Sequence, residues 1–239
     1  MNKIILALLL TTTLAAPAIA QNCVNSSRCD ELGYSKTTAD CDGLDTLVCP
    51  FDSNKVFCVF SEKSCEVGDI LYENKKCYVK AVDGKTAIGI VFDTEKRLAM
   101  ALDEKSLSWG GYGKEIGSAA QTTSGKSNTT AILAYGRANN IEYPAAEYCN
   151  SYSTIGTKAG GWYLPSMEEL ESLAANYIVV NEKLMTIAGN TAISEKSSYW
   201  SSSELSNYSA RRQVPLSGDP YYSDDLKTNV FRVRPVLAF

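Results

Sequence analysis

The stretches SYWSSSE at residues 198–204 and RVRPVLAF at residues 232–239 decide the expected fold of this chain. Both carry large aromatic and apolar side chains, which is typical of strands that pack into a core. The segment between them is rich in Tyr, Ser, Asp, Asn and Arg, and shows neither a strand period nor a helical period. We therefore expect a rigid frame that holds an irregular polar and aromatic surface segment.

The composition of this segment is typical of protein-binding loops. Tyr gives a large contact area at low entropic cost, while Ser and Asn adapt their hydrogen bonds. Aromatic anchors and charged selectors are the usual division of roles in such surfaces. The expected ligand-binding residues are Tyr208, Arg211, Arg212, Tyr221, Tyr222, Ser223, Asp224, Asp225, Thr228 and Phe231. An ordinary solvated loop has a similar composition, so that alternative stays open.

The first twenty residues have the pattern of an export signal. Lys3 precedes an apolar run from Ile4 to Ala15, and Ala18-Ile19-Ala20 forms a small-residue cleavage site. The run is shorter than the roughly 20 apolar residues that a spanning helix needs. We expect a mature protein that begins at Gln21, has no transmembrane segment, and is periplasmic, displayed at the cell surface or secreted.

All eight cysteines follow the expected cleavage site, and an even number in an exported chain predicts disulfides. Residues 21–66 hold six of them and few large apolar residues, so cross-links would stabilise a module with a small core. The candidates in this module are Cys23, Cys29, Cys41, Cys49, Cys58 and Cys65. Cys77 and Cys149 are expected as a bridge or as two buried thiols. The connectivity is open.

Charge and residue types exclude several classes of function. The chain has 23 basic and 27 acidic residues, a net charge of −4 and no strongly basic run, so nucleic acid is not an expected partner. The absence of histidine excludes Ser-His-Asp and Cys-His mechanisms. Zinc is disfavoured because no Cys-x-x-Cys pair occurs either. We expect no metal and no cofactor.

Paired carboxylates leave glycoside hydrolysis as a chemical alternative. Glu168 and Glu169 are adjacent on a predicted helix and point in different directions, so a helix cap explains them better. Asp224 and Asp225 lie in the expected recognition segment, where solvent-facing or calcium-ligating roles are alternatives, the latter together with Asp219. We therefore expect that the protein is not an enzyme.

The remaining elements predict an α+β layout, with helices in the middle of the chain and strands at both ends. The capping box formed by Ser166 and Glu169 predicts a helix start. Trp162 and Trp200 are expected in the core, and Trp109 is expected to be exposed in a long loop at residues 108–130. The expected antiparallel strands lie at 68–72, 86–92 and 97–102, and the other expected helices lie at 130–138, 144–149 and 179–187.

Three motifs in fixed order carry a family resemblance: GWYLPSxxEL at 161–170, YWSSSE at 199–204 and VRPV at 233–236. They resemble the bacterial surface-protein family that includes the Lcl C-terminal domain, and more widely the C-type-lectin-like fold shared with formylglycine-generating enzymes. The resemblance covers about residues 67–239. It implies a C-type-lectin-like domain whose chain ends pair in a small sheet flanked by two helices. Formylglycine-generating chemistry is not expected, because Cys149 is the only cysteine after Cys77.

Within that family, the chain resembles variable proteins diversified by retroelements that mutate template adenines. Their variable segments begin near YWSSSE or YWSSTE and end near VRPV, which implies a variable segment at residues 205–232. Such mutagenesis of Asn-type codons cannot give Glu, Gln, Lys, Trp or Met, and between Leu205 and Val233 only Gln213 and Lys227 fall outside the reachable set. The family often has an aromatic residue after the position of Ala210, where this chain has Arg211.

The sequence thus predicts a signal peptide at 1–20, a cysteine-rich module at 21–66 and a C-type-lectin-like domain at 67–239. The expected function is an exported ligand-binding or adhesion protein with a diversifiable recognition surface. Its expected partner is an extracellular protein or glycan. The alternatives are an exported carbohydrate-active enzyme and a structural component of the cell envelope.

Overall fold

A computed structural model describes residues 45–49, 52–59, 64–121, 123–194, 196–214 and 221–239. The chain divides into two compact units between Lys63 and Ser64. In the first unit, strands β1 (Asp45–Cys49) and β2 (Asp52–Val59) form an antiparallel hairpin. Cys49 and Cys58 lie on these two strands, whereas Cys23, Cys29, Cys41 and the expected signal peptide lie outside the described residues.

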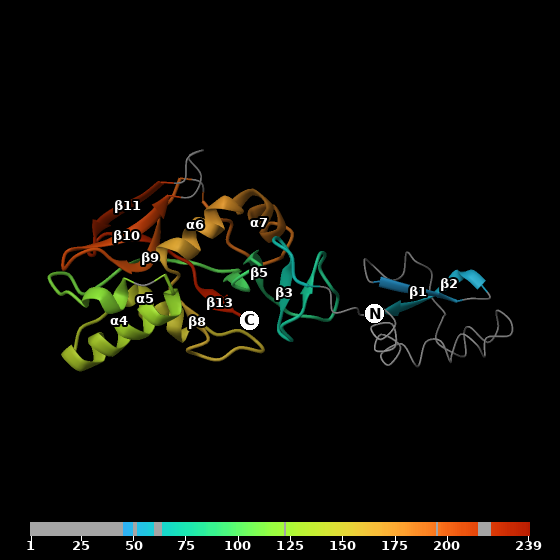
Figure 1. Ribbon diagram of the computed structural model, residues 1–239, viewed down its shortest axis with the longest axis horizontal. Helices are drawn as coiled ribbons and strands as arrows, with labels where there is room; N and C mark the ends of the chain where they lie inside the picture. Colours follow the sequence, from blue (N-terminus) through green and yellow to red (C-terminus); the bar gives the residue numbers. More distant parts are fainter. Residues whose placement is uncertain (1–44, 50–51, 60–63, 122, 195, 215–220) are drawn as a thin grey trace, which may run out of the picture. The chain divides into compact units, whose positions relative to one another are not determined.

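The second unit is an α+β domain with two sheets and helices on both sides (Figure 1). The six-stranded sheet has the order β4-β3-β5-β6-β13-β8. Its strands are β3 (Ile70–Tyr72), β4 (Cys77–Tyr78), β5 (Ala87–Asp93), β6 (Leu98–Ala101), β8 (Trp162–Tyr163) and β13 (Val236–Ala238). The expected antiparallel pairing of β3, β5 and β6 is confirmed. Strand β13, at the end of the chain, pairs with β6 and β8, so the two ends of the domain meet in one sheet.

The five-stranded sheet has the order β11-β10-β9-β12-β7 and is mixed, because β12 runs parallel to β9. Its strands are β7 (Lys105–Ser108), β9 (Tyr199–Glu204), β10 (Ser209–Val214), β11 (Tyr221–Leu226) and β12 (Val230–Val233). The stretch at 232–239 is therefore not one strand. It breaks at Arg234 and Pro235, and its two halves belong to different sheets.

Four α-helices pack against these sheets in the described part of the domain. Figure 1 shows α4 and α5 on the opposite side of the domain from α6 and α7. The helices are α4 (Gly125–Asn139), α5 (Pro144–Ser151), α6 (Met167–Ala175) and α7 (Tyr177–Leu184). All four expected helices are confirmed in type, and the first is longer than expected.

The expected long loop at 108–130 is wrong. A 3-10 helix, η2, spans Gly117–Ala120, and α4 begins at Gly125 after an N-cap at Ser124. A Cβ atom at Gly125 would lie 2.4 Å from the Glu169 carboxylate, so glycine permits close packing there. Trp109 is 1% exposed and donates from Nε1 to the Ser201 carbonyl at 2.8 Å, which corrects the expectation of an exposed tryptophan. Gly110, Gly111 and Gly125 in this stretch permit close packing, because a Cβ atom at each would lie within 2.6 Å of a neighbouring atom.

One disulfide is described, and it joins Cys65 to Cys77 with a Cα–Cα distance of 5.3 Å. Cys149 is a free, buried thiol, and burial raises its pKa well above the usual value. The expected bridge between Cys77 and Cys149 is therefore wrong, and of the alternative, two buried thiols, only the part for Cys149 is confirmed. Cys77 is on the edge strand β4 at the start of the domain, whereas Cys149 is on α5 within the core cluster that contains Trp109 and Trp200.

The predicted capping box at the start of α6 is confirmed. The Ser166 hydroxyl accepts from the Glu169 amide at 3.2 Å, and the Glu169 carboxylate accepts from the Ser166 amide at 2.9 Å. The carboxylate also accepts from the Gly125 amide, so Glu169 links the starts of α6 and α4. Burial raises the Glu169 pKa. This side chain has a structural role that needs no catalytic function to explain it.

Replacing Ser166 by alanine should lower the free energy of unfolding by about 1 kcal/mol, because the Glu169 amide loses its acceptor. Urea denaturation measures the change. Ser151→Ala, at the exposed end of α5, is the matched control and should change stability by less than about 0.5 kcal/mol. Equal stability of the Ser166→Ala variant and the wild type would contradict the capping assignment.

Candidate recognition surface

The segment at 205–232 is mostly regular structure, which corrects the expectation of an irregular loop. Strands β10 and β11 form an antiparallel hairpin, and β12 follows at Val230. Ala210, Gln213 and Lys227 are buried within this segment. The sequence does not show the alternation of buried and exposed residues that is typical of a strand, because buried residues occur on both faces of β10. Ala210 and Gln213 are both buried and point to opposite faces.

The register of the hairpin divides the predicted ligand-binding residues between two faces. Arg212 lies opposite Ser223, and Arg211 lies opposite Asp224. Residues directly opposite in a sheet point to the same face, and neighbours along a strand point to opposite faces. The set of ligand-binding residues predicted from the sequence therefore includes residues that point to opposite faces of the sheet.

A half-buried cluster forms around Arg212 on one face. The Arg212 Nε atom lies 3.1 Å from an oxygen of Asp225, and Nη1 donates to the Ser198 hydroxyl at 2.5 Å. The guanidinium carbon lies 4.9 Å from the ring centroid of Phe231, which in turn packs edge-on against Trp200 at 4.9 Å. We call these five residues the Arg212 cluster. Its ion pair and cation–π contact fix Arg212 in place and leave it partly exposed.

Ser223 lies opposite Arg212 on the same face and is partly exposed, whereas Tyr208, Thr228, Asp224 and Arg211 make none of the contacts of this cluster. Tyr208 and Thr228 are exposed at the end of the hairpin where β10 begins and β11 ends. Asp224 is exposed, and Arg211 is partly buried. Tyr221 and Tyr222 occupy the first positions of β11, and the structure does not describe their side chains. The proposed calcium ligand Asp219 also lies outside it, and no group of three metal-ligating side chains occurs among the described residues.

A buried ion pair anchors the end of the hairpin where β10 begins and β11 ends. The Lys227 and Glu204 side chains are both 0% exposed, with Nζ 2.6 Å from Oε1. Lys227 also donates to the Lys114 carbonyl at 2.8 Å and lies over the Trp109 ring. The other Glu204 oxygen accepts from the amides of Ile116 and Gly117, both at 2.8 Å. Burial lowers the Lys227 pKa, and the Glu204 carboxylate acts in the opposite direction.

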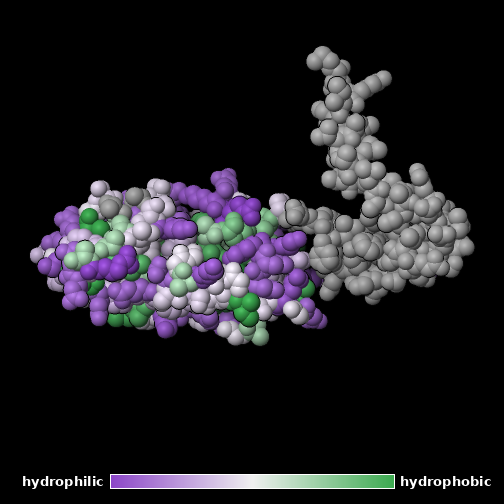
Figure 2. Space-filling view, turned by 90° about the horizontal axis from the view of Figure 1, so that it is seen from below, coloured by the Kyte–Doolittle hydropathy of each residue, from purple (hydrophilic) through white to green (hydrophobic). Residues whose placement is uncertain are grey.

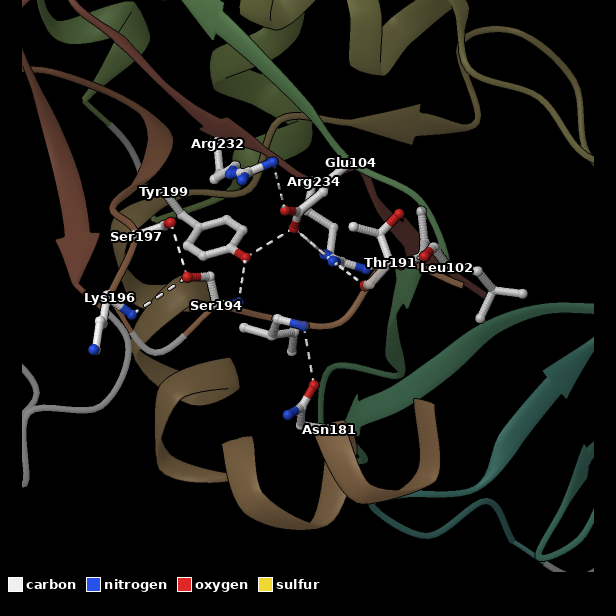
Figure 3. Close-up of polar contacts among 12 residues, drawn as sticks. Leu102, Glu104, Asn181, Thr191, Ser194, Lys196, Ser197, Tyr199, Arg232 and Arg234 are labelled. Atoms are coloured by element: carbon white, nitrogen blue, oxygen red, sulfur yellow. Dashed lines mark hydrogen bonds and ion pairs between the residues drawn. The ribbon is translucent and has the colours of Figure 1, made fainter. Parts of the chain in front are cut away.

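A second buried network fastens the VRPV motif to the frame (Figure 3). Glu104 accepts from both Nε and Nη2 of Arg234, at 3.1 and 2.5 Å, and from the Tyr199 hydroxyl at 2.8 Å. Arg232 approaches the same carboxylate at 3.3 Å. Arg234 also donates to the backbone oxygens of Ala101, Leu102 and Thr191. Burial raises the Tyr199 pKa to about 12. Arg234 of this motif, together with the preceding Arg232, therefore stabilises the frame around β9 and β12.

Sequence reasoning missed two contributors to this surface. One is Ser198, which accepts a hydrogen bond from Arg212. Trp200, which packs against Phe231, was predicted as core, and its burial confirms that prediction. Tyr112 is 50% exposed, and its ring lies 5.2 Å from that of Tyr208. The signal for Tyr112 was present in the glycines at 110, 111 and 113, which indicate a tightly turned segment rather than a flexible one.

In the view of Figure 2, hydrophilic residues predominate on the described part, and apolar residues form small separate groups. Single exposed apolar residues of this kind are normal on soluble domains. No helix of the described part is long and apolar enough to cross a membrane.

Comparison with known proteins identifies the fold but not the activity. No protein-family model matches the chain, and no curated protein matches it in sequence. Its structure is similar to that of a fimbrial protein from Bacteroides ovatus, with a TM-score of 0.61 and 17% sequence identity. The similarity covers 73% of this chain and 49% of that protein, so the match spans about half of the length of the fimbrial protein. The identity is low enough that the likeness shows a shared fold alone.

Proposed function

We propose that the protein is an exported adhesion protein whose C-type-lectin-like domain presents the β10–β11 hairpin to a ligand outside the cell. Three features support this function. The structural neighbour is a fimbrial protein. A disulfide closes the start of the domain, as is common in exported proteins. The last strand of the domain pairs with an early one, as the family resemblance implies.

The pattern of burial in the segment at 205–232 carries the proposal. Gln213 is 1% exposed and Lys227 is 0% exposed, and these are the two residues of the segment that adenine mutagenesis of Asn-type codons cannot produce. Ala210 is also buried, although such mutagenesis can produce alanine. Tyr208, Asp224 and Thr228 can be produced and are exposed. A diversifiable surface requires two kinds of position. Its buried positions must stay fixed, and its exposed positions must be free to vary.

A binding experiment with the mature chain tests the proposal. The protein is immobilised on beads and exposed to mucin, fibronectin, laminin and collagen. The triple variant Ser223→Ala, Asp224→Ala, Thr228→Ala removes side chains from the hairpin. The control variant Ile155→Ala, Ile178→Ala, Met185→Ala removes three exposed side chains elsewhere in the domain.

We expect the wild type to bind at least one of these components, the hairpin variant to lose about tenfold or more in affinity, and the control to retain it. Failure of the wild type to bind any component, or equal binding by the hairpin variant, would overturn the proposal. Diversification has its own test at the gene level: an adenine-rich near-copy of the segment beside a reverse-transcriptase gene is expected, and its absence contradicts that part.

A further inference from the structure

Three loop segments meet at the end of the hairpin where β10 begins and β11 ends. The Gly113 amide donates to the Asn207 carbonyl at 2.8 Å, and the Lys227 amide donates to the Tyr208 carbonyl at 2.9 Å. The Gly110 amide donates to the Lys227 carbonyl at 3.2 Å, so each segment bonds to the other two. We call residues 110–117, 205–208 and 227–229 the loop end. It brings together segments that are about a hundred residues apart in the sequence.

Two tyrosine rings form the exposed part of the loop end. Tyr112 and Tyr208 are 50% and 49% exposed, their ring centroids are 5.2 Å apart, and their planes are inclined at 54°. Gly111 and Gly113, with φ of +61° and +81°, flank Tyr112 in conformations that favour glycine. The backbone therefore holds Tyr112 against Tyr208 and leaves a face of this aromatic pair accessible.

Apart from Leu205, which is 40% exposed, the exposed side chains around the two rings are polar, and their charges nearly cancel. The Lys227 ammonium group is buried and paired with Glu204, so it contributes no net charge to the surface. Thr228 and Asn229 are exposed, and Asn207 is partly exposed. These side chains supply a hydroxyl group and amide oxygens, while the Asn229 amide nitrogen already donates to Asp225. The exposed charges of Lys114 and Glu115 have opposite signs. Nothing in the described loop end favours an anionic or a cationic ligand.

We propose that Tyr112 and Tyr208 form an aromatic platform that binds a neutral saccharide. The proposal rests on the proposed function, since it names the chemistry of the extracellular ligand. A sugar ring has an apolar C–H face that packs on an aromatic ring and hydroxyl groups at its edge that exchange hydrogen bonds with amides and hydroxyls. Aromatic contact area with a few convergent neutral polar groups is the composition that such a ligand needs.

The buried Lys227–Glu204 pair pre-organises this platform. Lys227 bonds to the segment at 110–117 through the Lys114 carbonyl, and Glu204 bonds to the same segment through two amides. The rings are therefore already close together before a ligand arrives, so binding does not have to order them.

The test uses the full mature chain with defined probes. Binding is measured by calorimetry to N-acetylchitotetraose, lacto-N-tetraose and mannotetraose, with a heparin tetrasaccharide as the charged counterpart. Mucin is offered before and after enzymatic deglycosylation. The variants are Tyr112→Ala, Tyr208→Ala and Tyr112→Phe, which keeps the ring, and Ile155→Ala serves as the surface control. Thermal melts confirm that each variant is folded.

We expect the wild type to bind at least one neutral oligosaccharide. Tyr112→Ala and Tyr208→Ala should each lower the affinity for it about tenfold or more, and the affinity of Tyr112→Phe should stay within about twofold of the wild-type value. Deglycosylation of mucin should abolish binding. The absence of saccharide binding, preference for heparin, or full affinity of Tyr112→Ala would overturn the proposal. If deglycosylated mucin still binds through the hairpin, the ligand is a protein surface, and this inference fails while the proposed function stands. If the wild type binds neither mucin nor any protein component, both fail.

Discussion

Replacement of Lys227 by methionine should lower the free energy of unfolding by about 3–5 kcal/mol, because it leaves the Glu204 carboxylate buried without its partner. Both side chains are fully buried, and Lys227 also bonds to the Lys114 carbonyl and lies over Trp109. Chemical denaturation followed by tryptophan fluorescence measures the loss. Methionine keeps much of the side-chain volume, so the missing charge is the main change.

Two further variants make this result specific to the ion pair. Lys114→Met removes an exposed ammonium group from the same loop end and should change stability by less than about 0.5 kcal/mol. Adding Glu204→Gln to Lys227→Met should restore part of the lost stability, because the unpaired charge is then gone. If the losses of unfolding free energy add up in the double variant, or if Lys227→Met alone has a small effect, the ion pair does not stabilise the loop end.

Trp200→Ala should also cost about 3–5 kcal/mol. Its indole is fully buried, donates to the Leu107 carbonyl at 3.1 Å and supports the ring of Phe231. The truncation leaves a cavity within the Arg212 cluster, next to the ring of Phe231. Urea denaturation measures the effect, and Tyr208→Ala is the exposed aromatic control. A loss from Trp200→Ala no greater than that from Tyr208→Ala would contradict the assignment of Trp200 to the frame.

Local chemistry made part of the fold predictable. The spacing of Ser166 and Glu169 determined where α6 begins, because the two side chains bond to each other's amides. Pro144 likewise marked the first turn of α5. The strands around Ile70, Ile90 and Met100 were visible because short apolar runs were separated by clear turn residues.

The parts that the sequence did not predict depend on contacts between distant residues. Trp109 is buried because Ser201 accepts its indole hydrogen bond, and nothing near Trp109 in the sequence indicates that partner. The Cys65–Cys77 pairing depends on β3 and β4 forming a hairpin, which a count of cysteines cannot show. The division of Arg211 and Arg212 between two faces required the strand register.

The central claim is that exposed side chains of the hairpin carry recognition while buried ones carry stability. The most direct measurement compares the Ser223→Ala, Asp224→Ala, Thr228→Ala variant with the wild type, by urea denaturation and by binding to the component that the wild type recognises. We expect each substitution to cost no more than about 0.5 kcal/mol of stability and the variant to lose binding. If the variant loses as much stability as Trp200→Ala, or keeps its stability and its affinity together, the hairpin is not a separable recognition surface and the account is contradicted.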